Sequence, residues 1–121
     1  MYRQLSTSPG RFHVLFVAAL NLSLSATPEV CLNIDEKPSI WAQKALNFQA
    51  EPKQIEVLDH TGHRLILCCP RQWGKSTITA LKAVHHALHN PHSLILVLSP
   101  SARQSAEFLK KAKEFVHMLG L

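Results

Sequence analysis

Two short runs of apolar residues stand out in the second half of the chain because neither alternates with polar positions. Residues 65–69 read LILCC and residues 94–98 read LILVL. Five consecutive apolar residues are typical of a strand that is buried on both faces, as in a parallel sheet. Both runs are therefore predicted to be strands of this type.

Two short helices are predicted before the first of these strands. Ser39 is a plausible N-cap for a helix over residues 39–48, since its hydroxyl can accept from a free backbone N–H group. Pro52 suits the first turn of a second helix over residues 52–60, because its missing N–H group would have no partner there.

Two longer helices are predicted on either side of the second strand. Residues 75–89 place their apolar side chains on one stripe, and a proline shortly afterwards ends the pattern. Ser101 is predicted to cap a last helix that runs to about residue 119. On its outer face, Glu107 and Lys111 have the i, i+4 spacing of a favourable ion pair.

The order strand, helix, strand, helix predicts an α/β fold with a parallel sheet and right-handed crossovers. Two strands are too few to make such a sheet complete, so an incomplete parallel sheet flanked by helices is expected. A polar stretch at residues 33–38 suggests a boundary. Residues 1–38 are interpreted as a leader of uncertain structure, and residues 39–121 as one structural unit.

The leader itself permits a different interpretation. Arg3 and Arg11 precede an apolar run over residues 12–20, and the small residues of 23–26 follow it. That order resembles a secretory signal peptide, which would imply a small secreted protein.

Composition narrows the choice of function. A chain of 121 residues with 46% hydrophobic residues suits one packed domain and excludes wholesale disorder. Up to Cys69 the acidic and basic residues cancel, whereas seven Lys or Arg residues against two Glu residues follow it. A local basic excess suits phosphate-bearing ligands such as nucleotides or nucleic acid, although a solvated helix face would look the same. Three cysteines without a CxxC pair indicate buried thiols in a reducing compartment.

The chemistry is expected at residues 69–77, which read CPRQWGKST. A phosphate-binding loop reads GxxxxGK[ST], and only the first glycine is missing, replaced by Cys69. Backbone N–H groups at the helix N-terminus would point at the phosphates. Gly74 would allow close approach, Lys75 would meet the β- and γ-phosphates, and the Ser76 hydroxyl would bind Mg²⁺.

This loop resembles the deviant phosphate-binding loop of large terminase subunits from tailed bacteriophages, a pattern close to [S/C]xRQxGK[ST] that includes Cys69 and the Arg71-Gln72 pair. The lead-in over residues 41–54 and the Ser-Pro that follows the second strand also agree in layout. The resemblance covers about residues 39–121.

The resemblance implies an ATP-driven motor that packages double-stranded DNA, working in the bacterial cytoplasm as a homo-oligomeric ring with a portal and a small terminase subunit, and without a membrane. Gln54 would recognise adenine, since an amide offers both a donor and an acceptor. Arg71 would act with Lys75 as a catalytic residue, stabilising charge on the γ-phosphate. The implied ATP-binding residues are Gln54, Cys69, Pro70, Arg71, Gln72, Trp73, Gly74, Lys75, Ser76 and Thr77.

Several family features are missing. After residues 94–98 no apolar run ends in Asp or Asp-Glu, so the second Mg²⁺ ligand and the catalytic acid are absent, as is the nuclease domain. The chain is therefore expected to be an N-terminal fragment of such a motor that hydrolyses ATP slowly or not at all. A fragment of a helicase-like ATPase and a non-catalytic remnant that serves as a small interaction protein remain as alternatives.

Histidines cluster in the helix over residues 75–89 and just beyond it. His85 and His89 lie one turn apart, a spacing that a metal site can use. No acid or cysteine is placed nearby in the sequence to complete a tetrahedral site, so exposed or helix-terminal histidines are expected instead.

Overall fold

A computed structural model describes residues 36–121, together with the backbone of residues 16–20. Most of the predicted leader, including its resemblance to a signal peptide, lies outside the described residues. The elements are β1 (Phe16–Leu20), α1 (Pro38–Leu46), α2 (Pro52–Leu58), α3 (Lys75–His89), β2 (Ile95–Ser99) and α4 (Ala102–Met118). Within the described part, no helix is long and apolar enough to cross a bilayer.

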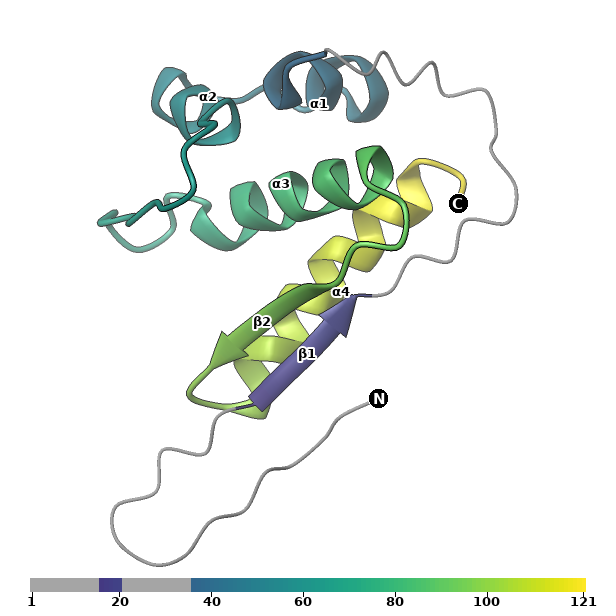
Figure 1. The fold of residues 1–121 in the computed structure, drawn as a ribbon. Coiled ribbons are helices and arrows are strands. Elements are labelled where there is room, and N and C mark those ends of the chain that lie inside the picture. Colours follow the sequence, from purple (N-terminus) through teal and green to yellow (C-terminus); the bar gives the residue numbers. More distant parts are fainter. Residues whose placement is uncertain (1–15, 21–35) are drawn as a thin grey trace, which may run out of the picture.

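Helix α3 lies at the centre of the core. Helices α1 and α2 pack on one side of it and α4 packs on the other (Figure 1). The predicted apolar stripe of α3 is buried, as shown by Ile78, Leu81, Val84 and Leu88. Full burial of an aliphatic side chain of this size contributes about 1.5–3 kcal/mol, so this stripe is the main source of stability in the unit.

The short helices each bury a large side chain against α3. Trp41 of α1 is 2% exposed and Leu58 of α2 is 1% exposed. Ala112 brings α4 into the same cluster. Neither α1 nor α2 is long enough to be stable alone, so this packing holds them in place.

The strand predicted over residues 94–98 is confirmed to within one residue, but its environment differs from the prediction. β2 pairs antiparallel with β1, Phe16 lying opposite Ser99 and Leu20 opposite Ile95, and α4 contacts both strands (Figure 1). Leu96 and Leu98 are more than half exposed. The prediction of burial on both faces was therefore wrong, because the described elements supply no second layer over this ladder.

Residues 65–69 form no strand among the described residues. Ile66 is 87% exposed, and the free thiol of Cys68 is exposed as well. A buried strand requires a paired neighbour and a covering layer, and β2 is paired with β1 instead. The predictions of a buried strand and of a buried Cys68 thiol were wrong for this segment. The described residues contain no parallel pair, so the parallel sheet stays a prediction.

The ends of the helices agree only in part with those predicted from the sequence. The bounds of α3 are as predicted, and the Ser101 hydroxyl accepts from Gln104 N at 3.4 Å as the cap of α4. Ser39 is not a cap, because α1 already begins at Pro38 and Lys37 occupies the N-cap position. Glu107 does not pair with Lys111 as predicted but with the Arg103 guanidinium, at 3.1 Å.

Candidate nucleotide site

One hydrogen bond brings two distant parts of the predicted site together. Gln54 is the third residue of α2, and its side-chain Nε2 donates to the backbone oxygen of Trp73 at 2.9 Å. Its Oε1 accepts from Glu51 N at 3.0 Å, which fixes the start of the helix. Each half of the amide retains capacity, since Nε2 has a second N–H and Oε1 has a second lone pair.

The loop over residues 69–74 turns sharply into α3. Gln72 and Gly74 both have positive φ, at 62° and 91°, and Gly74 is the N-cap of the helix. A Cβ atom on Gly74 would lie 3.3 Å from Gln54 Nε2, so a side chain there would press on the amide. Glycine is thus needed at position 74 for two reasons: the positive φ of the backbone and the small space beside the Gln54 amide.

Lys75 closes this loop on itself. Its Nζ donates to the backbone oxygen of Cys69 at 2.9 Å, six residues earlier in the chain. The side chain is exposed and therefore accessible to a ligand. Since a neutral carbonyl is a weaker partner for an ammonium group than a phosphate oxygen, a bound phosphate would compete well for this lysine.

A pocket of about 510 Å³ lies between the start of α2 and this loop. Seven of the ten residues predicted to bind ATP line it: Gln54, Pro70, Arg71, Gln72, Trp73, Gly74 and Thr77. Cys69, Lys75 and Ser76 are not part of its lining, although they adjoin it in sequence. Gln54 and the loop residues that precede Lys75 therefore share one hollow, which has the size of a small-ligand site.

The surroundings of the loop are basic. Arg71 is exposed, and no described residue pairs with its guanidinium. Lys111 of α4 donates to the Thr77 hydroxyl at 3.3 Å and so brings a third positive charge to the start of α3. No acidic residue occupies the first turn of that helix, so the positive end of its dipole is not neutralised there.

Four further residues line the pocket that were not predicted as site residues, and one of them, Ile78, was predicted only as part of the apolar stripe of α3. Phe48, Gln49 and Glu51 form its wall on the α2 side. Phe48 is half-buried and offers an aromatic surface beside the Gln54 amide. Glu51 and Gln54 have the spacing of a capping box, in which the first residue is the N-cap and the second is three positions later. This spacing was the one signal in the sequence that placed Glu51 next to Gln54.

The histidines lie apart from this pocket. The rings of His85 and His89 are stacked with centroids 4.0 Å apart, and the Trp41 ring meets His85 edge-on at 5.2 Å. His89 Nδ1 donates to the backbone oxygen of His85 at 2.8 Å. Among the described residues, no group of three or more His, Cys, Asp or Glu side chains is arranged to hold a metal ion.

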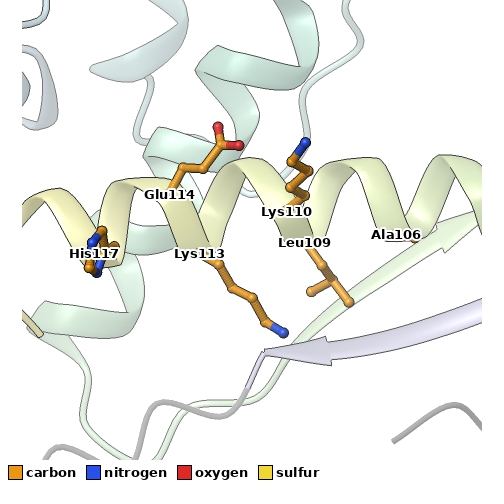
Figure 2. A pocket seen from close by; sticks show the side chains of 6 residues that line it. All are labelled: Ala106, Leu109, Lys110, Lys113, Glu114 and His117. Atoms are coloured by element: carbon orange, nitrogen blue, oxygen red, sulfur yellow. The ribbon is translucent and has the colours of Figure 1, made fainter.

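A second hollow, of about 420 Å³, runs along α4 (Figure 2). In Figure 2 the side chains of Leu109 and Lys113 extend toward the side of the helix where the two strands lie, while Lys110 and Glu114 extend from the other side. The described residues of its lining all come from this one helix, and they define no ligand.

No protein-family model matches this chain, and neither a characterised protein nor a solved structure is significantly similar to it. Function is therefore inferred from the geometry of the loop and the pocket.

Proposed function

We propose that the chain binds Mg·ATP in the pocket between α2 and the loop over residues 69–77, as part of a terminase-like DNA-packaging ATPase. The observation that carries the proposal is the shared pocket, in which Gln54 meets the loop that leads into Gly74-Lys75-Ser76, although about twenty residues of sequence separate them.

Gln54 supplies base recognition in this proposal. Adenine presents an acceptor at N7 and a donor at N6, which match the spare N–H and the spare lone pair of the amide. Guanine presents two acceptors at the corresponding positions, so it satisfies only the N–H. The chain is therefore proposed to prefer ATP over GTP.

The phosphates lie at the start of α3. Lys75 exchanges the Cys69 carbonyl for β- and γ-phosphate oxygens, and Arg71 extends toward the γ-phosphate. Ser76 fits an Mg²⁺ ligand, since it is exposed beside Lys75 and its hydroxyl has no partner among the described residues. Bound Mg²⁺ would neutralise charge on the β- and γ-phosphates.

Hydrolysis is proposed to be slow. The only acidic residues that follow β2 are Glu107 and Glu114, both on α4, and Glu107 is paired with Arg103. The carboxylate described in the pocket lining, Glu51, lies on the α2 side beside the residue proposed to recognise the base. Lys75 and Arg71 therefore stabilise charge, but no described carboxylate at the loop is placed to activate water. The terminase assignment itself, with double-stranded DNA, a portal, a small subunit and a ring of copies as partners, rests on the resemblance of the loop.

The test is equilibrium binding of a fluorescent ATP analogue in the presence of Mg²⁺. Lys75→Ala is expected to weaken binding at least tenfold, because a charge-assisted contact to phosphate is lost, and Arg71→Ala is expected to weaken it less. Lys110→Ala is the matched control, since Lys110 is an exposed lysine on α4. Equal affinity in Lys75→Ala and in the control would overturn the proposal. Rapid turnover by the unmodified chain would overturn the claim of slow hydrolysis.

A further inference from the structure

Lys82 joins α3 to the end of α2 by three hydrogen bonds. Its Nζ donates to the backbone oxygens of Val57 and Leu58, each at 2.9 Å, and of His60 at 2.6 Å. An ammonium group has three N–H donors, so this one uses all of them. The sequence gives no sign of such a role, because Lys82 looks like a polar position on an amphipathic helix.

These oxygens belong to the end of a helix, where backbone carbonyls lack partners within the helix itself. A positive charge at this end also complements the helix dipole. Burial lowers the pKa of Lys82 from its usual 10.5, and the nearby Asp59 carboxylate opposes that change by favouring the charged form. The lysine is thus a half-buried cation that the carbonyls at and just beyond the end of α2 stabilise.

The position of α2 depends on contacts of this kind. The helix has only seven residues, too few to be stable alone. Leu58 is buried, but apolar contact is non-directional and does not fix how a helix is turned about its axis. The three hydrogen bonds from Lys82 are directional, so they do fix the rotation of α2 about its axis. They fix it relative to α3, whose first residue is Lys75.

We propose that Lys82 is a positioning residue for base recognition: by fixing the end of α2 on α3, it sets the place of Gln54 relative to the phosphate-binding loop. This inference rests on the proposed function. Base recognition and phosphate binding depend on different elements in this proposal. The phosphates meet the loop and Lys75 at the start of α3, whereas the base meets Gln54, which belongs to α2. Loss of Lys82 should therefore weaken recognition of the base and leave phosphate binding in place.

The test compares three ligands, Mg·ATP, Mg·GTP and Mg·tripolyphosphate, by competition against a fluorescent ATP analogue. Lys82→Met is expected to weaken ATP binding about tenfold and to remove the preference over GTP, while tripolyphosphate affinity changes less than twofold. Lys110→Met, on α4, is the control for the loss of one charge. Lys82→Arg keeps cationic donors and should recover most of the preference. If Lys82→Met fails to fold, Lys82→Gln replaces it.

A double-mutant cycle with Gln54→Ala shows whether Lys82 acts through that amide. When Gln54 is already alanine, Lys82→Met should change ATP affinity by less than twofold, because the group that it positions is gone. Full additivity overturns the inference, and so does a parallel loss of ATP and tripolyphosphate binding. Wild-type protein that binds neither ligand overturns the proposed function instead. Wild-type protein that prefers ATP, and keeps this preference in Lys82→Met, overturns the inference alone.

Discussion

Gly74 occupies a position that no other residue fits without strain. Its φ of 91° lies in the left-handed region, and the space that a Cβ would need is already close to Gln54 Nε2. Gly120 has a similar φ of 76° but nothing within 4 Å of its Cβ position. An alanine at Gly120 would therefore have only the backbone cost of a left-handed conformation, whereas an alanine at Gly74 would also press on the pocket.

Gly74→Ala should lower the free energy of unfolding by about 1–2 kcal/mol, the cost of a left-handed conformation for a residue with a Cβ. Gly120→Ala should carry a similar backbone cost. Only Gly74→Ala should also weaken ATP binding, because it displaces the Gln54 amide. Urea denaturation and ATP titration of both variants check this, and unchanged ATP affinity in Gly74→Ala would contradict it.

His85 is a titratable group in a poorly solvated position. Burial is the main cause that lowers its pKa from 6.5 to about 4, and charge on His89, His86 and Lys82 lowers it further. The Glu36 backbone opposes this change through a hydrogen bond. The Nε2 atom is buried and has no hydrogen-bond partner among the described residues, which favours the neutral ring in the folded protein.

The stability of the fold should therefore fall as the pH drops from 6.5 to about 4. In this window the unfolded chain protonates His85 while the folded chain does not, so acid favours unfolding, by at most about 1.4 kcal/mol per pH unit for one proton. His85→Phe keeps a ring beside Trp41 and should flatten this dependence. The exposed His63 lies outside α3 and is not among the groups that lower the pKa of His85, so His63→Gln is the control and should leave the dependence unchanged. Urea unfolding at pH 7, 5.5 and 4.5 measures both, and an unaltered slope in His85→Phe would refute the assignment.

At the scale of the elements, Asp59 joins α1 to α2. Its carboxylate accepts from Ser39 N at 3.0 Å and from the Ser39 hydroxyl at 2.7 Å. The start of α1 therefore obtains its partner from a residue twenty positions later in the chain. A negative charge at a helix N-terminus is also favoured by the helix dipole. Ser39 is thus capped by another residue and is not itself a cap.

Asp59→Ala should lower the free energy of unfolding by about 1–2 kcal/mol, as does the loss of a helix cap in general. Asp59→Asn keeps one acceptor oxygen and should cost less. Thermal and urea unfolding of both variants give the comparison. An Asn variant as unstable as the Ala variant would mean that the charge matters more than the hydrogen bonds, and two variants of wild-type stability would show that α1 is held by Trp41 packing alone.

At the scale of the whole molecule, apolar side chains divide into a buried set around α3 and an exposed set. Ile78 is 0% exposed in the core, whereas Ile66 is 87% exposed in the segment that the sequence predicted as a buried strand. The same residue type therefore occurs in two opposite environments. This contrast makes the pair a direct test of the fold.

Ile78→Ala should cost about 2–5 kcal/mol, the range for large-to-small changes in a core. Ile66→Ala should change stability by no more than about 0.5 kcal/mol, as exposed substitutions do. Urea unfolding of the two variants side by side measures the difference. A cost of 2 kcal/mol or more at Ile66 would indicate that residues 65–69 are buried after all, as a strand of the parallel sheet would be.

The sequence predicted the helices well where their pattern was long. α3 and α4 carry several turns of amphipathic periodicity, and their bounds and the buried stripe of α3 agree with the prediction. Seven of the ten residues that the sequence predicted to bind ATP line one pocket, and their binding role stays a prediction. The second wall of that pocket was missed, because Phe48 and Gln49 lie in a connection whose path carries no periodic signal.

The sequence by itself determined which segments are helical and where the phosphate-binding loop motif lies, because periodicity and the GK[ST] spacing are local properties of the chain. Only the tertiary structure decided how apolar segments pair, since Ile95–Ser99 form β2 and pair with β1, while residues 65–69 form no strand and Ile66 is exposed. It also decided the partners of Ser39, Lys82 and Lys111. The physical reason is that strand pairing and hydrogen bonds between elements depend on which groups meet in space, and a linear pattern does not encode that distance.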